Sequence, residues 1–260
     1  DTMLELGAIF AAGIWAGMIN TVVGSGTLVT FPVLLLFGYP PLTANVSNNI
    51  GLLAGSVSGV YGYRAEARQH LGLVLRLLPA SAAGGLAGAL LLFVLPAEAF
   101  GAIVPVLIAI GLLMVVVGPS LQRRAAARRD PDDTSTGRTG SPRASLVVLV
   151  FALGVYGGYF GAAQGILLVG LFGVMLTIGM QGINALKNVL AGVVNGVAAI
   201  VFVVVARDHI DWKVVGLIAG GSLIGGYVGA RVGRRLPPNA LRAVILAVGI
   251  VALVRIVLFD

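Results

Sequence analysis

The fold is decided by the stretch GMINTVVGSGTLVTFPVLLLFG, residues 17–38, an apolar run interrupted at Gly24-Ser25-Gly26. A second interrupted run, GGYFGAAQGILLVGLFGVMLTIG at residues 157–179, breaks at Gly161-Ala162-Ala163-Gln164-Gly165. Hydrocarbon offers no hydrogen-bond partner to backbone groups freed by such a break, so each break must be buried in protein or line a cavity. The sequence therefore predicts two copies of one broken hairpin and directs the search for function to the breaks.

Composition places the chain in a membrane. Of its 260 residues, 58% are hydrophobic and only 10% are charged, and its mean hydropathy is +1.02. Such a chain cannot cover a soluble globule with a charged surface. Its 38 glycines allow transmembrane helices to approach closely. We therefore predict an all-α, polytopic transmembrane protein.

Apolar segments fall five to each half of the chain. They lie at residues 4–23, 27–38, 43–63, 72–95 and 98–118, and at residues 146–160, 166–179, 183–205, 213–231 and 240–258. The second segment of each half is too short to cross a bilayer, which takes about 20 residues. We predict a first repeat at residues 1–120, a flexible polar linker at residues 121–144 and a second repeat at residues 145–260. Each repeat then has a broken hairpin and three spanning helices.

Arginine-rich loops set the predicted orientation. Arginines crowd the loop at residues 64–76, the linker, and the loop at residues 231–242, so the positive-inside rule places all three in the cytoplasm. The turns at residues 96–98 and 207–213 then face outward, as do both termini. Threading the spans between these loops makes corresponding segments run in opposite directions. The two repeats are therefore predicted to be inverted, as in many secondary transporters.

Polar residues inside the apolar segments gather at the two breaks and at the start of the span after each. The candidate binding residues are Asn20, Thr21, Gly24, Ser25, Gly26, Ser47 and Asn48 in the first half, and Gln164, Gly165, Lys187 and Asn188 in the second. Each alone could simply bond neighbouring helices. Their clustering favours a binding site near the membrane midplane. The helices that start after Gly26 and Gly165 would add N-terminal N–H groups, which attract anions.

The distribution of charge favours an anionic ligand. All ten acidic residues fall in loops or at termini, so no carboxylate is available at the midplane for a cation site or proton relay. Lys187 lies a few residues into its span, where it could contact an anion or extend to the cytoplasmic interface.

The remaining residues argue against other classes of function. The chain has no cysteine and only two isolated histidines, so neither a metal nor another cofactor is predicted. Without a nucleophile and base inside the membrane, the chain is not predicted to be an enzyme. Because the basic residues lie mostly in loops between apolar spans, nucleic acid is not a predicted partner.

The order of motifs resembles the TauE/SafE family of sulfite exporters over nearly the whole chain outside the linker. The resemblance is carried by Gly13-x3-Gly17-x2-Asn20-x3-Gly24-x-Gly26, Pro32, Ser47-Asn48, Asn184-Ala-Leu-Lys187-Asn188 and His209-Ile-Asp211-Trp212. The family's Gly-rich hairpins and Asn-bearing spans match Gly24, Gly26, Asn48, Gly165 and Asn188. The second hairpin departs from the pattern because it carries Gln164 and lacks both a second glycine at the equivalent spacing and the proline.

This resemblance implies a transporter of small anions in the prokaryotic plasma membrane. We expect export of sulfite, a sulfonate or a related organosulfur anion by alternating access, with the membrane potential as driving force. The alternatives are an importer or channel for small carboxylate or organosulfur anions, and a non-transporting membrane assembly protein. The predicted partners are the small anion and membrane lipid, with a homo-oligomer as a further candidate.

Overall fold

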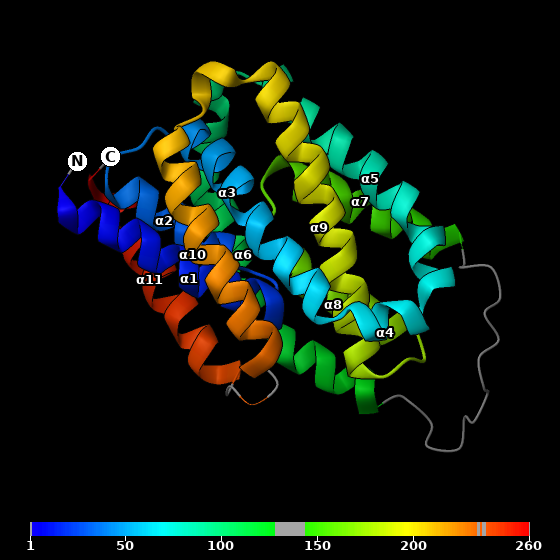
Figure 1. Cartoon of the computed structure of the whole chain (residues 1–260). Coiled ribbons are helices and arrows are strands. Elements are labelled where there is room, and N and C mark those ends of the chain that lie inside the picture. The colour runs from blue at the N-terminus through cyan, green and yellow to red at the C-terminus, as the bar shows by residue number, and fades with distance from the viewer. Residues whose placement is uncertain (1, 128–143, 233–234, 236–237, 260) are drawn as a thin grey trace.

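A computed structural model of the chain describes residues 2–127, 144–232, 235 and 238–259. The prediction of an all-α fold is confirmed, since no strand occurs within these ranges. The first half contains α1 (Met3–Val22), α2 (Thr27–Leu36), α3 (Pro41–Gly62), α4 (Arg64–Gln69), α5 (Leu71–Val94) and α6 (Ala97–Ala127). The second contains α7 (Ala144–Tyr159), α8 (Gln164–Met175), α9 (Met180–Val205), the 3-10 turn η1 (Arg207–His209), α10 (Trp212–Val232) and α11 (Pro238–Phe259) (Figure 1).

The helices follow the predicted segments, with two differences. The short helix α4 joins α3 to α5 and was not predicted, because its sequence RAEARQ is polar and only six residues long. Helix α6 continues to Ala127, past the predicted end of the first repeat at residue 120. The rest of the predicted linker, residues 128–143, lies outside the described residues.

Six of the described helices are long and apolar enough to cross a membrane: α1, α5, α6, α9, α10 and α11. Helices α2, α7 and α8 are shorter. Helix α3 has a spanning length of 22 residues but is more polar, and its Asn45, Ser47 and Asn48 side chains are buried within the protein. The chain is thus a multi-pass membrane protein, and these polar side chains of α3 face its interior.

The two halves of the chain interlock. Helix α1 packs against α10, and its counterpart α7 packs against α5. In the same way α3 packs against α10 and α9 against α5, while α2 contacts α11 and α8 contacts α6. Wherever a helix of the first half packs against the second half, the corresponding helix of the second half packs against the first. The first helix of each hairpin, α1 or α7, therefore packs against a helix from the other half of the chain.

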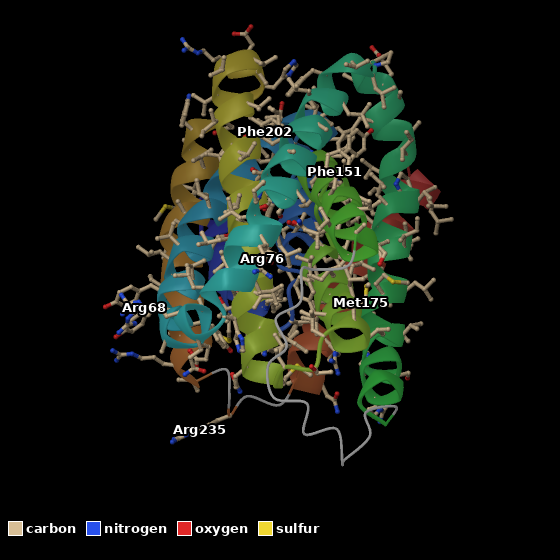
Figure 2. The ribbon with its side chains drawn as sticks, turned by 90° about the vertical axis from the view of Figure 1, so that its right-hand side faces the viewer. Arg68, Arg76, Phe151, Met175, Phe202 and Arg235 are labelled. Atoms are coloured by element: carbon tan, nitrogen blue, oxygen red, sulfur yellow. The ribbon has the colours of Figure 1, made fainter. Side chains whose placement is uncertain are left out.

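Helices α3 and α9, which follow the two hairpins, run in opposite directions. A Cβ added to Gly59, near the end of α3, would lie 3.5 Å from Oδ1 of Asn188, near the start of α9. At the other end, Ser47 accepts a hydrogen bond of 2.9 Å from the N–H of Asp211, beyond the end of α9. In Figure 2, Arg68 and Arg235 lie toward one end of the molecule and Phe202 toward the other. Inversion of the complete repeats across the membrane stays a prediction.

Glycines allow the crossing helices to touch backbone to backbone. A Cβ on Gly221 of α10 would lie 2.5 Å from the carbonyl oxygen of Phe10 in α1. We expect Gly221→Val to destabilise the protein by about 1–3 kcal/mol, because the added side chain must push the helices apart. Thermal unfolding in detergent measures the loss. Gly216→Val, on the same helix with nothing within 4 Å of the added Cβ, is the matched control. An equal loss in both variants would rule out the crossing as the cause.

Candidate anion-binding site

The two helix breaks meet back to back. Each turns on a glycine with positive φ, +93° at Gly24 and +73° at Gly161. The N–H of Gly165 donates to the carbonyl of Gly24 over 3.1 Å, and a Cβ on Gly24 would lie 2.6 Å from Cα of Gly165. The broken backbones of the two halves therefore satisfy part of each other's hydrogen bonding, as a break within a membrane requires.

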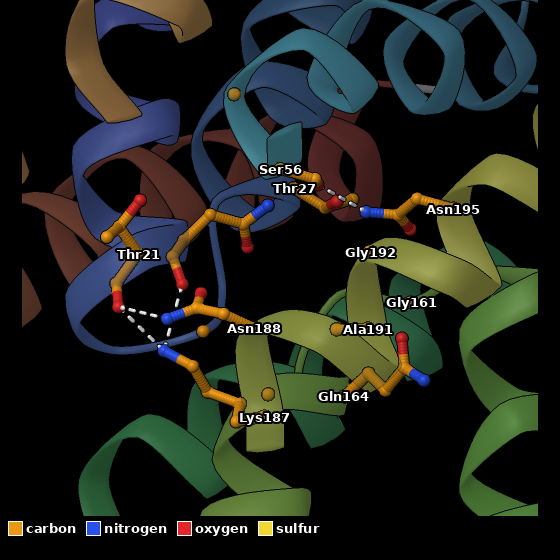
Figure 3. Close-up of a pocket in the computed structure, with 14 residues that line it drawn as sticks. Thr21, Thr27, Ser56, Gly161, Gln164, Lys187, Asn188, Ala191, Gly192 and Asn195 are labelled. Carbon is orange, nitrogen blue, oxygen red and sulfur yellow. Dashed lines mark hydrogen bonds between the residues drawn. The ribbon is translucent and has the colours of Figure 1, made fainter. Parts of the chain in front are cut away.

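A small cavity of about 30 Å³ lies beside this crossing (Figure 3). A volume of about 10–15 Å³ is enough to hold one water, so this cavity has room for two or three waters or for an ion of a few atoms. Its lining comes from both breaks, from the second half of α3 and from the first half of α9. The lining residues are Asn20, Thr21, Gly24, Thr27, Gly55, Ser56, Gly161, Gln164, Gly165, Lys187, Asn188, Ala191, Gly192 and Asn195.

Most of the residues predicted to bind ligand are among these. The structure brings Asn20, Thr21, Gly24, Gln164, Gly165, Lys187 and Asn188 together around the cavity. Ser25 and Gly26 lie in the first break but outside the lining. The Gly26 N–H donates to the Asn20 side chain over 3.1 Å, which joins the break to the end of α1.

Ser47 and Asn48 lie away from the cavity. Ser47 bonds the backbone of Asp211 at the far end of α9, as described above. The Asn48 side chain bonds the hydroxyls of Thr30 and Thr27 and so connects α3 to α2. The cavity meets α3 about two turns further along, at Gly55 and Ser56.

Several lining residues were not among the candidates. On α9, Ala191, Gly192 and Asn195 follow Lys187 and Asn188 at helical spacing, so they share one face of the helix. This helical spacing after Lys187 was the signal in the sequence that could have identified them as lining residues. The Asn195 amide donates to the Ser56 hydroxyl over 3.1 Å and joins α9 to α3 (Figure 3).

Lys187 is buried at the cavity with an exposed fraction of 1%. Its Nζ donates to the carbonyl oxygens of Asn20 over 3.1 Å and of Thr21 over 2.8 Å (Figure 3). Such carbonyls in the last turn of a helix lack intrahelical partners and form the negative end of its dipole. The ammonium is thus held by the end of α1, without extending to the interface, and one of its three N–H donors is left for a ligand.

Each hairpin is held by the helix that follows the other hairpin. Asn188 reinforces Lys187 with a bond of 3.4 Å from its amide to Thr21 O. In the opposite direction, the Asn45 amide of α3 donates over 3.0 Å to the carbonyl of Tyr159, at the end of α7. The end of α1 is therefore stabilised by the ammonium of Lys187 and the amide of Asn188, whereas the end of α7 is stabilised by the amide of Asn45.

Polar groups without partners remain at the breaks. Gln164 is 3% exposed and its amide nitrogen Nε2 has no hydrogen-bond partner among the described residues, nor has the buried hydroxyl of Ser25. Leaving such a group unsatisfied costs about 1–3 kcal/mol. Gln164 lines the cavity, and its amide lies against Gly157 of α7, where an added Cβ would be 2.5 Å from Nε2.

The helix N-termini provide fewer free donors than predicted. The Gly26 N–H is used by the Asn20 side chain, and the Gly165 N–H by the Gly24 carbonyl. The donors for a ligand are therefore chiefly the ammonium of Lys187 and side-chain amides. No carboxylate occurs among the cavity's described lining residues, so the site can hold a small acceptor of negative charge.

Comparison with known proteins gives one family. The model of the family described as sulfite exporter TauE/SafE matches residues 9–256. A probable membrane transporter protein, ORF9, of Sinorhizobium sp. is 28% identical over 252 residues, which cover 96% of this chain and 92% of that protein. The probable membrane transporter protein YfcA of Escherichia coli K12 is 28% identical over 239 residues, covering 90% and 81%. A probable membrane transporter protein of Haemophilus influenzae is 27% identical over 227 residues, covering 87% and 84%. No solved structure matches the chain.

Proposed function

The chain belongs to the TauE/SafE family of sulfite exporters, and from that premise we propose that this membrane transporter exports a small sulfur-containing anion, such as sulfite or a sulfonate. The observation that carries the proposal is the buried ammonium of Lys187, which lines a cavity between the two breaks without a carboxylate in the described lining. A buried cation needs a compensating partner, and an anionic ligand supplies one.

The chemistry of the lining supports an oxyanion. Amide and ammonium N–H groups donate to oxygen acceptors, and hydrogen bonds to a charged acceptor are roughly twice as strong as neutral ones. The unpaired Nε2 of Gln164 and the remaining donor of Lys187 come from two successive helices of the second half, α8 and α9. A sulfite or sulfonate group, with three acceptor oxygens around one sulfur, suits donors arriving from several directions.

The cavity's position supports alternating access. It is bordered by Gly55 and Ser56, about two turns before the end of α3, and by a face of α9 that begins at Lys187, about two turns after the start of that helix. Beside the second break, Phe160 packs edge to face on Phe31 with ring centroids 5.1 Å apart, and on Phe100 at 6.2 Å. Phe100 begins α6 just after the turn predicted to face outward. Rocking of the interlocked halves would part these rings and open the cavity toward that turn.

Membrane potential is the simplest driving force for export. An anion leaving a negative interior gains about 2.3 kcal/mol per charge per 100 mV. We expect proteoliposomes loaded with sulfite to show saturable efflux that rises as the lumen is made negative, together with sulfite counterflow. Net efflux insensitive to the potential would contradict the electrogenic mechanism. Flux without saturation or counterflow would indicate a channel, and absence of any anion flux would remove the transport assignment.

A carboxylate placed in the cavity should repel the ligand. We expect Gln164→Glu to weaken sulfite binding roughly 100- to 1,000-fold, because two like charges about 4 Å apart repel by about 4 kcal/mol at an effective dielectric constant of 20. The effect should be larger at pH 8 than at pH 6, since more of the introduced carboxyl is then ionised. Titration calorimetry on the purified protein measures it. Gln69→Glu makes the same change on exposed α4 and should leave binding intact, whereas equal losses would contradict a local role for Gln164.

A further inference from the structure

The charge of the cavity restricts the charge of its ligand. Lys187 is the one ionisable side chain among the described lining residues. The other polar side chains of the lining are uncharged: Asn20, Thr21, Thr27, Ser56, Gln164, Asn188 and Asn195. The described acids lie at the ends of helices or in turns. Glu5, for example, accepts a bond of 2.8 Å from the Tyr39 hydroxyl near the start of α3.

The helix dipoles do not alter this balance. Each break joins the C-terminal end of one helix to the N-terminal end of the next, α1 to α2 and α7 to α8. A helix carries about half a negative charge at its C-terminus and half a positive charge at its N-terminus. The partial charges of the two breaks therefore cancel in pairs, and a protonated Lys187 gives the empty site a single positive charge.

Neutrality of the loaded site selects the ionic form of the substrate. A monoanion beside Lys187 forms a neutral pair, whereas a dianion leaves one uncompensated negative charge in a buried site, which is strongly unfavourable. Resting on the proposed function, we infer that the transporter carries monovalent oxyanions, hydrogensulfite or a monovalent sulfonate, and rejects dianions such as sulfate and the fully ionised sulfite.

This charge rule also identifies the step on which the potential acts. The loaded site crosses the membrane uncharged, and the empty site returns with one positive charge. A negative interior draws the empty site back toward the cytoplasm, so one charge still moves per cycle of export. Exchange of substrate for substrate uses only loaded carriers and should not respond to the potential, while net efflux should.

Competition against labelled sulfite counterflow in proteoliposomes tests the rule. Methanesulfonate and nitrate are the monovalent probes and sulfate is the divalent one, because none of them changes ionisation between pH 6 and pH 8. We expect at least one of the two monoanions to compete about 100-fold or more better than sulfate. If sulfate competed as well as both methanesulfonate and nitrate, the charge rule would be wrong, while the proposal of sulfite transport would still stand. Absence of sulfite counterflow would instead remove the proposed function itself.

Two further measurements separate the rule from ligand shape. Exchange rates should be the same at imposed potentials of either sign, and a clear dependence would show that the loaded site carries net charge. Gln164→Lys adds a second cation to the cavity. In this variant we expect the competition by sulfate, measured relative to methanesulfonate, to be at least about 10-fold stronger than in the unmodified protein. Gln69→Lys on the exposed face of α4 is the matched control, and the same shift there would also contradict the rule.

Discussion

Replacement of Lys187 by Met is expected to weaken sulfite binding roughly 10- to 150-fold and to lower efflux accordingly. The estimate follows from the 1.5–3 kcal/mol typical of a hydrogen bond to a charged group, at about 1.4 kcal/mol per tenfold change. Met has a similar length and no charge, so it removes the ammonium and its bonds to the end of α1. Titration calorimetry in detergent and counterflow in liposomes measure the two quantities.

The same substitution could act through the fold, since Lys187 also binds the carbonyls of Asn20 and Thr21. Removing the ammonium leaves the buried Asn20 carbonyl without this donor, which costs about 1–3 kcal/mol. We therefore expect Lys187→Met to lower the thermal unfolding midpoint as well as the affinity for sulfite. Lys187→Arg retains the positive charge and should recover part of the affinity. Binding unchanged in the Met variant, or lost equally in Arg and Met, would contradict the ligand role of the charge.

The sequence was sufficient to predict an all-α, multi-pass membrane fold because its signals are local. The Gly24 and Gly161 breaks, apolar runs of limited length, and arginine-rich loops each report on their own segment. Convergence of Asn20, Gln164 and Lys187 on one cavity followed from the expectation that the polar residues at both breaks share one site near the membrane midplane. In such cases a residue type and its place along a span are enough.

What the sequence could not provide was the contact each side chain makes. Ser47 and Lys187 occupy matching positions in the two halves, yet Ser47 bonds the turn before α10 while Lys187 binds the end of α1. The difference depends on where α3 and α9 cross the rest of the bundle. Likewise, use of the Gly165 N–H by the Gly24 carbonyl depends on a long-range approach that no local pattern encodes.

Replacement of Gly24 by Ala is expected to disrupt both stability and transport. The residue has a φ of +93°, which costs an L-residue about 1–2 kcal/mol. The added Cβ would also lie 2.6 Å from Cα and 2.8 Å from C of Gly165, so the two breaks must separate. Overpacking of this kind costs a further 1–3 kcal/mol or so. We expect a total loss of about 2–5 kcal/mol, together with loss of sulfite counterflow, because the cavity is built on this crossing.

Two matched substitutions separate strain from crowding. Gly38 has a φ of +86° but nothing within 4 Å of an added Cβ, so Gly38→Ala should show only the conformational cost and should retain counterflow. Gly165 is not among the glycines with positive φ, yet a Cβ there would lie 2.7 Å from the Gly24 carbonyl oxygen, so Gly165→Ala should show chiefly the crowding. Thermal unfolding and counterflow on the three variants measure both effects. If Gly38→Ala proved as damaging as Gly24→Ala, backbone strain alone would explain the result. If Gly165→Ala transported normally, close contact between the two breaks would not be needed for transport.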